Sequence, residues 1–257
     1  MPISFFGLAF VVGGVLGSFV NAFTCQMHSQ QSITRGRSIC CACARTIAWY
    51  DLFPFINFLW LRKRCRFCGH KISWQYPVVE WLTGFVFAGL VALHWNRGSF
   101  LTSSMFVELG ATVLMAIIFL SDLKYQLIPV KLILTISGLL FIIFLLTSSA
   151  SIVSRLVALS IGGGFFYFQY LVSSGRWIGS GDIYVGIFMG LLLGWPHILT
   201  ALFLAYVVGA IVSLILLSLG KKTLQNSTPF ATYLAASTLV IMIAGNNILV
   251  WYLSFFK

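Results

Sequence analysis

Long apolar runs recur along this chain, and they constrain its fold more than any other feature. A run of about 20 apolar residues crosses the roughly 30 Å of hydrocarbon in a bilayer as an α-helix. Of the 257 residues, 60% are apolar and only 8% are charged, which excludes a water-soluble globular class. We therefore expect an all-α polytopic membrane protein, with about eight transmembrane helices near residues 4–24, 77–95, 102–120, 128–147, 153–172, 183–196 (a short one), 198–218 and 229–254.

The basic residues are distributed unevenly over the loops that these helices define. The net charge is +11, with 16 Lys and Arg residues. Eight helices place both termini on one side of the membrane, and only Arg97, Arg155 and Lys257 fall in the loops of that side. Loops rich in Lys and Arg face the cytoplasm, so we expect both termini outside. Topology and anionic lipid headgroups account for the charge, and we expect no nucleic-acid partner.

One polar segment separates the first helix from the others, which predicts three regions. Residues 1–24 form a first transmembrane helix, retained because it has no basic start typical of a cleaved signal peptide. Residues 25–76 form a small cytoplasmic domain, and residues 77–257 form a seven-helix membrane core. A domain of about 50 residues is only marginally stabilised by a hydrophobic core and usually needs a metal or disulfides.

The cysteines indicate how this cytoplasmic domain is stabilised. Two Cys-x-x-Cys pairs are typical of a structural zinc site with four thiolates in tetrahedral arrangement. Disulfides are the alternative, but they seldom persist in a reducing compartment. Thiol exchange is a further alternative, and Cys25 and Cys41 have no assigned role. The predicted metal ligands are Cys40, Cys43, Cys65 and Cys68.

The acidic residues are few enough that each needs an explanation. The chain has five: Asp51, Glu80, Glu108, Asp122 and Asp182. Asp122 closes the third predicted helix, and Asp182 opens the sixth in Gly179-Ser180-Gly181-Asp182, so both lie at the predicted cytoplasmic face. Acids at helix ends are also stabilised by the helix dipole without any catalysis.

Two close carboxyl groups can hydrolyse a peptide bond. One must be ionised to take a proton from water, and the other protonated to polarise the scissile carbonyl. Like charges a few Å apart cannot both ionise cheaply, so such a pair shares one proton, as in the aspartic proteases. The glycines beside Asp182 let a substrate strand approach this carboxyl group. We therefore predict Asp122 and Asp182 as the catalytic pair.

Together these residues resemble the type IV prepilin peptidase family over nearly the whole chain. The resemblance rests on both cysteine pairs, on the two aspartate motifs and on further stretches: Gly17-Ser18-Phe19-Val20-Asn21, Asp51-Leu52-Phe53-Pro54, Gln75-Tyr76-Pro77-Val78-Val79-Glu80 and Thr228-Pro229-Phe230. It implies a bacterial inner-membrane enzyme that removes the short basic leader of type IV prepilins or type II secretion pseudopilins. Their hydrophobic N-terminal helix would lie beside the enzyme in the lipid.

The resemblance also implies a second activity, and the sequence departs from the family pattern at two positions. Members with the cysteine domain commonly methylate the new N-terminal amine with S-adenosylmethionine, and Glu80 is a candidate participant because a buried Glu in a transmembrane helix tends to be functional. Cys41 stands where the family usually has Pro. Tyr184 stands where the family usually has Lys, which predicts altered substrate preference or pH dependence.

Three other functions compete with this hypothesis. A proton-coupled transporter also uses membrane carboxylates, but it tends to place them near the midplane rather than at one face. A general membrane-helix protease shares the Gly-x-Gly-Asp motif and lacks the cysteine domain. A nonenzymatic assembly factor would agree with the altered residues after Asp182.

Overall fold

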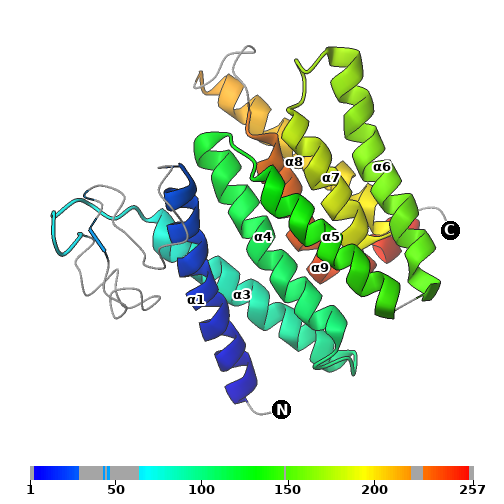
Figure 1. Cartoon of the computed structure of the whole chain (residues 1–257), viewed down its shortest axis with the longest axis horizontal. Coiled ribbons are helices and arrows are strands. Elements are labelled where there is room, and N and C mark those ends of the chain that lie inside the picture. Colours follow the sequence, from blue (N-terminus) through cyan, green and yellow to red (C-terminus); the bar gives the residue numbers. More distant parts are fainter. Residues whose placement is uncertain are drawn as a thin grey trace. The chain divides into compact units, whose positions relative to one another are not determined.

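The computed structural model describes residues 3–28, 43, 45–46, 64–147, 149–220 and 228–254. Within these residues the chain is helical, with no strand beyond isolated bridge residues, of which Arg64 and Lys71 pair with each other (Figure 1). The helices are α1 (Ile3–His28), α3 (Gln75–Asn96), α4 (Ser103–Tyr125), α5 (Val130–Thr147), α6 (Ser149–Ser173), α7 (Ser180–Leu193), α8 (His197–Ser218) and α9 (Phe230–Ser254). The predicted all-α class with about eight helices is confirmed.

Seven of these helices are long and apolar enough to cross a membrane, and α7 is not. At 14 residues, α7 is about 21 Å long, which is less than the hydrocarbon thickness. It also begins three residues earlier than predicted, so Asp182 lies in its first turn. The apolar run continues to Trp195, but Gly194 adopts a positive φ of 70° and Pro196 follows, and together these end the helix.

The chain divides into two compact units, residues 1–120 and 121–257. In the first unit α1 and α3 are in close contact along glycines. A Cβ atom at Gly13 would lie 2.7 Å from the carbonyl oxygen of Thr83, and the Thr83 hydroxyl donates to the Gly13 carbonyl at 2.9 Å. This contact holds α1 and α3 together, and the cysteine-rich segment connects these two helices.

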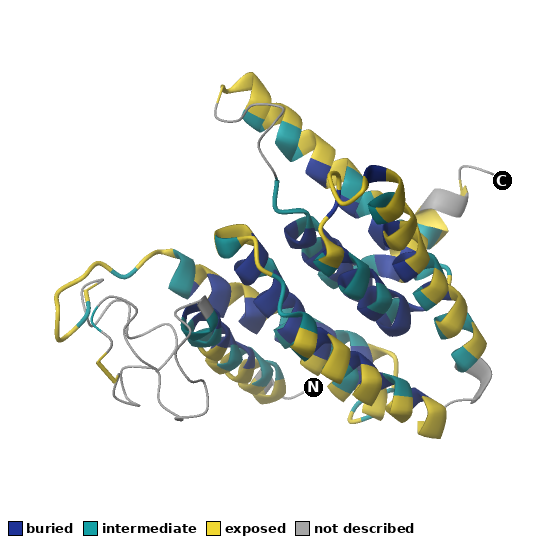
Figure 2. Ribbon diagram, turned by 45° about the horizontal axis from the view of Figure 1, so that its top comes forward, coloured by how far each residue is buried: buried dark blue, intermediate teal, exposed yellow. Residues whose placement is uncertain are grey.

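In the second unit α7 is the central helix. It contacts α5, α6, α8 and α9 (Figure 1). Most of its residues are buried. Gly186 and Gly190 let α6 approach closely, since a Cβ at Gly186 would meet the Gly162 carbonyl oxygen at 2.6 Å. Around the centre, helices carry a buried face and an exposed apolar face, as on α8, where Ala205 is buried and Phe203 is exposed (Figure 2).

Candidate functional site

Asp122 lies in the last turn of α4 and is only 5% exposed. Its Oδ2 atom accepts two hydrogen bonds from Thr232, one from the backbone N–H at 2.8 Å and one from the hydroxyl at 3.1 Å. The backbone of Ala231 lies beside the same carboxyl group. These donors belong to the first turn of α9, where backbone N–H groups have no partner within the helix. The start of α9 therefore holds the first predicted carboxyl group.

Asp182 lies in the first turn of α7 and is equally buried, at 5% exposure. Its Oδ2 atom accepts a hydrogen bond from the backbone N–H of Gly179 at 3.2 Å, which caps the helix. Its Oδ1 atom is buried and has no hydrogen-bond partner among the described residues. One oxygen of this carboxyl group is thus left for a ligand.

The structure brings the two aspartates together within the second unit. The segment after Asp122 leaves α4 through Gln126, whose φ is 51°, and reaches Ile128 against the start of α7. A Cβ atom at Gly181 would stand 2.7 Å from the Ile128 side chain, so only glycine permits this approach. The two carboxyl groups are near enough to interact electrostatically. They come from residues 60 positions apart in the sequence.

Aromatic residues surround this pair. Tyr206 of α8 interacts electrostatically with Asp182 and donates a hydrogen bond to Gln169 of α6 at 3.0 Å. Its ring lies 4.9 Å from that of Phe230, the first residue of α9. Tyr233 interacts electrostatically with Asp122. The surroundings of the two acids are therefore partly apolar, which strengthens electrostatic coupling between them.

Tyr184, the departure from the family pattern, is half-buried on α7. It follows Asp182 by two positions within the same helix, and residues two apart do not face each other. The altered substrate preference or pH dependence expected from Tyr184 stays a prediction.

The cysteine-rich segment contains a candidate metal centre. The Sγ atoms of Cys43, Cys65 and Cys68 all lie within 4.8 Å of one another. The second pair sits in a tight turn, in which the Cys65 N–H donates to the His70 carbonyl and the Gly69 N–H donates to the Cys65 carbonyl, both at 2.9 Å. Gly69 adopts a φ of 69°, which favours glycine. The predicted fourth ligand, Cys40, lies outside the described residues, as do Cys41 and Asp51.

Two other predicted positions have surroundings that the sequence did not indicate. Cys25, near the end of α1, is disulfide-bonded, which departs from the expectation that these cysteines stay reduced. Glu80 is 7% exposed on α3, and its Cα atom would lie 2.9 Å from a Cβ placed on Gly17 of α1. Glu80 therefore lies at a helix–helix contact.

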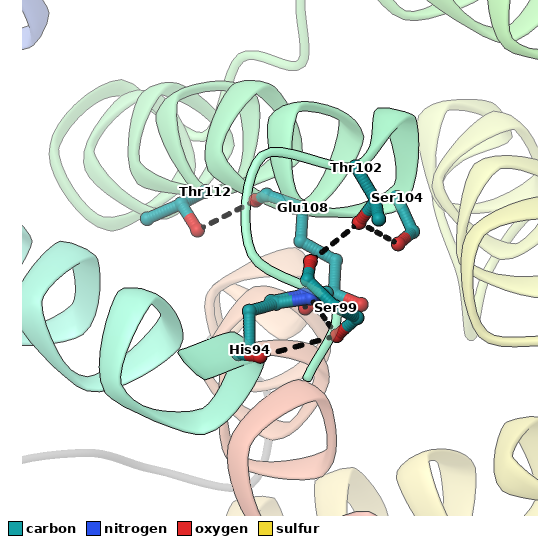
Figure 3. A network of polar contacts seen from close by, with 6 residues as sticks. All are labelled: His94, Ser99, Thr102, Ser104, Glu108 and Thr112. Carbon is teal, nitrogen blue, oxygen red and sulfur yellow. Dashed lines mark hydrogen bonds and ion pairs between the residues drawn. The ribbon is translucent and has the colours of Figure 1, made fainter. Parts of the chain in front are cut away.

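A polar network that the sequence analysis did not predict joins α3 and α4 in the first unit (Figure 3). His94 is 4% exposed; its Nε2 lies 3.1 Å from Glu108 Oε2, and its Nδ1 lies 2.9 Å from the Ser99 hydroxyl. The Thr102 hydroxyl donates to the Ser99 carbonyl at 2.7 Å, which fixes the connection between the helices. This network explains Glu108 as a structural acid.

Thr232, Tyr206 and Gln169 were likewise not singled out from the sequence, although they lie around the aspartates. Thr232 had one signal, because it follows the Thr228-Pro229-Phe230 motif by two residues, at the third position of α9. Backbone N–H and hydroxyl groups in the first turn of a helix are free to donate to a carboxylate that lies beside the helix N-terminus. Tyr206 and Gln169 lie in apolar helices and gave no such signal.

Comparison with known proteins agrees with this arrangement. The family model of the bacterial peptidase A24 N-terminal domain matches residues 11–95, and that of the type IV leader peptidase family matches residues 109–214. Both aspartates lie within the second match. No solved structure matches the chain.

Curated relatives with the name prepilin leader peptidase/N-methyltransferase match most of the chain. The protein from Bacillus subtilis (strain 168) is 27% identical over 96% of this chain and 97% of its own length. That from Legionella pneumophila is 32% identical over 85% of this chain and 76% of its own length. That from Myxococcus xanthus (strain DK1622) is 33% identical over 81% of this chain and 62% of its own length. The chain therefore belongs to the type IV leader peptidase family.

Proposed function

We propose that this chain is a membrane aspartic endopeptidase that removes the leader of type IV prepilins or type II secretion pseudopilins at the cytoplasmic face of the bacterial inner membrane. The observation that carries the proposal is the pair of buried, electrostatically interacting carboxyl groups of Asp122 and Asp182. The names of the curated relatives support prepilins as substrates. The gathering of both acids at the ends of their helices favours this function over a transporter.

The reaction needs one ionised and one protonated member of the pair. The ionised carboxylate takes a proton from water, and the water oxygen bonds to the scissile carbonyl carbon while the protonated carboxyl donates its proton to the carbonyl oxygen. The resulting tetrahedral diol collapses when one diol O–H returns its proton to the carboxylate that donated first. The C–N bond then breaks, and the amine takes the proton that came from water. Both groups return to their starting states.

Membrane lipid is the second partner of the proposal. Large apolar side chains are exposed on the helices of the second unit, including Val153, Phe168 and Phe203. Such surfaces are stable in hydrocarbon and would lie beside the apolar N-terminal helix of a prepilin. The scissile bond at the border of that helix could then reach the aspartates at the ends of α4 and α7.

The names of the relatives also support N-methylation of the new N-terminus, with S-adenosylmethionine as methyl donor. The position first considered for it, Glu80, is buried on α3 beside the contact of that helix with Gly17 of α1, which does not by itself give its carboxyl group a role in methyl transfer. We therefore assign no step of the methyl transfer to this residue.

The cysteine cluster fits a structural metal. Sulfur atoms within 4.8 Å of one another can occupy three corners of a tetrahedron around zinc, for which the Zn–S distance is about 2.3 Å. Cys43, Cys65 and Cys68 would hold the ion, with Cys40 as the proposed fourth ligand. A bound zinc would supply folding energy to the small cytoplasmic domain rather than chemistry.

Mass spectrometry of a co-expressed prepilin tests the substrate and the reaction together. We expect loss of the leader mass and a mass gain of one methyl group in cells with the wild-type chain. Cells with Asp182→Asn, which differs by one buried group, control for other proteases. A prepilin that keeps its leader beside correctly inserted wild-type protein would contradict the proposal.

A further inference from the structure

We propose that Thr232 is a positioning residue that keeps Asp122 ionised, so that Asp122 is the general base of the pair and Asp182 is the general acid. This inference rests on the proposed peptidase function and deepens it. It starts from a difference between two carboxyl groups that are buried to the same extent.

Asp122 is surrounded by donors. Thr232 directs both its backbone N–H and its hydroxyl at the same oxygen, Oδ2, at 2.8 and 3.1 Å, and these groups come from the first turn of a 25-residue helix. Hydrogen bonds to a carboxylate oxygen stabilise the ionised form. A proton on Oδ2 would have to displace one of these donors.

Asp182 has fewer donors around its carboxyl group. It accepts one hydrogen bond, from Gly179 at 3.2 Å, and its buried Oδ1 has no partner among the described residues. A buried carboxylate oxygen without a donor is costly, whereas the same oxygen, once protonated, can itself donate to a substrate carbonyl. The unpartnered Oδ1 is thus placed to act as the acid.

The other titratable groups near the pair do not reverse this difference. The described groups that interact with the two acids are Tyr233, beside Asp122, and Tyr206, beside Asp182. Both are phenols, which stay neutral at neutral pH. Lys124 and Lys131, the cations on either side of the loop after Asp122, are exposed.

Three variants separate a positioning role from a packing role. Thr232→Val removes the hydroxyl donor at nearly constant volume and keeps the backbone N–H. Thr232→Ser restores the hydroxyl. Thr238→Val makes the same change further along α9, at a fully buried threonine whose hydroxyl donates only to the Leu234 carbonyl of its own helix.

The measurement is the pH profile of kcat and of KM for a prepilin with purified protein in detergent. For Thr232→Val we expect a roughly tenfold lower kcat with KM unchanged, because a hydrogen bond to the charged base is lost. The acidic limb of the profile should move to higher pH and the alkaline limb should stay. Thr232→Ser and Thr238→Val should match the wild type.

The possible results are distinct. A wild-type profile for Thr232→Val, or an equal loss of kcat in Thr238→Val, would overturn the positioning role. Movement of the alkaline limb alone would overturn the assignment of base and acid. Cleavage by Asp122→Asn at the wild-type rate would instead refute the proposed peptidase function, so the two failures are distinguishable.

Discussion

The substitution Gly181→Ala tests whether the approach of α7 to the segment after Asp122 builds the active site. The new Cβ would stand 2.7 Å from Ile128 Cδ1 and 2.9 Å from Ile128 Cβ, whereas ordinary contacts begin at 3.4 Å. Since 3.4 − 2.7 = 0.7, the start of α7 must retreat by about 0.7 Å. Asp182 is the next residue and would move with it.

Such a displacement has a calculable effect on the rate. A misplacement of about 1 Å in an active site costs up to about 100-fold, and a free-energy cost in proportion to about 0.7 Å gives roughly a 25-fold lower kcat for Gly181→Ala. Crowding of this kind also lowers the free energy of unfolding by about 1–3 kcal/mol. The assay is the initial rate of prepilin cleavage by purified protein, together with a thermal unfolding curve in the same detergent.

Two glycines provide matched controls for this variant. A Cβ at Gly164 meets nothing within 4 Å, and one at Gly179 would lie 3.7 Å from Asp182 Oδ2, an ordinary contact. Both alanine variants should therefore lose much less activity than Gly181→Ala. Adding Ile128→Ala should restore part of the rate, because the nearest clashing atom is removed while Cβ remains. If Gly181→Ala cleaved within twofold of the wild-type rate, the reasoning about this contact would be refuted.

Two further predictions concern the first unit. Purified protein should contain one zinc per chain by elemental analysis, and Cys65→Ser should lose this zinc. His70 is an exposed residue in the same turn, so His70→Ala should keep the zinc. Loss of zinc in His70→Ala would contradict the four-cysteine site. His94→Ala should lower the free energy of unfolding by about 1–3 kcal/mol, because it removes the partner of Glu108, and should leave kcat unchanged at a temperature where the chain is folded. An unchanged unfolding midpoint would show that this pair does not stabilise the turn.

The long helices were predictable because an apolar stretch that can span a membrane is recognised from its length and composition alone. The start of α7 was not, since its position depends on the cap at Gly179 and on the crowded contact at Gly181. Hydropathy does not register either feature. The same limit applied to the end of α7, which the positive φ of Gly194 decides.

The two aspartates were predictable from their rarity and their motifs, but the difference between them was not. That difference depends on Thr232, which lies 110 positions from Asp122 in the sequence. A contact of this kind appears only once α9 packs against the end of α4. The His94–Glu108 pair was missed for a similar reason, because the turn that joins its two helices has no sequence motif.

The central claim is that Asp122 and Asp182 act as one catalytic unit, and the most direct test is the cleavage rate of purified Asp122→Asn, Asp182→Asn and the double variant. Residues that act as a unit are non-additive, so each single variant should lose at least about 1000-fold in kcat and the double variant should be no slower than either. All three proteins should bind zinc and unfold as the wild type does. A single variant that retained cleavage near the wild-type rate would contradict the claim.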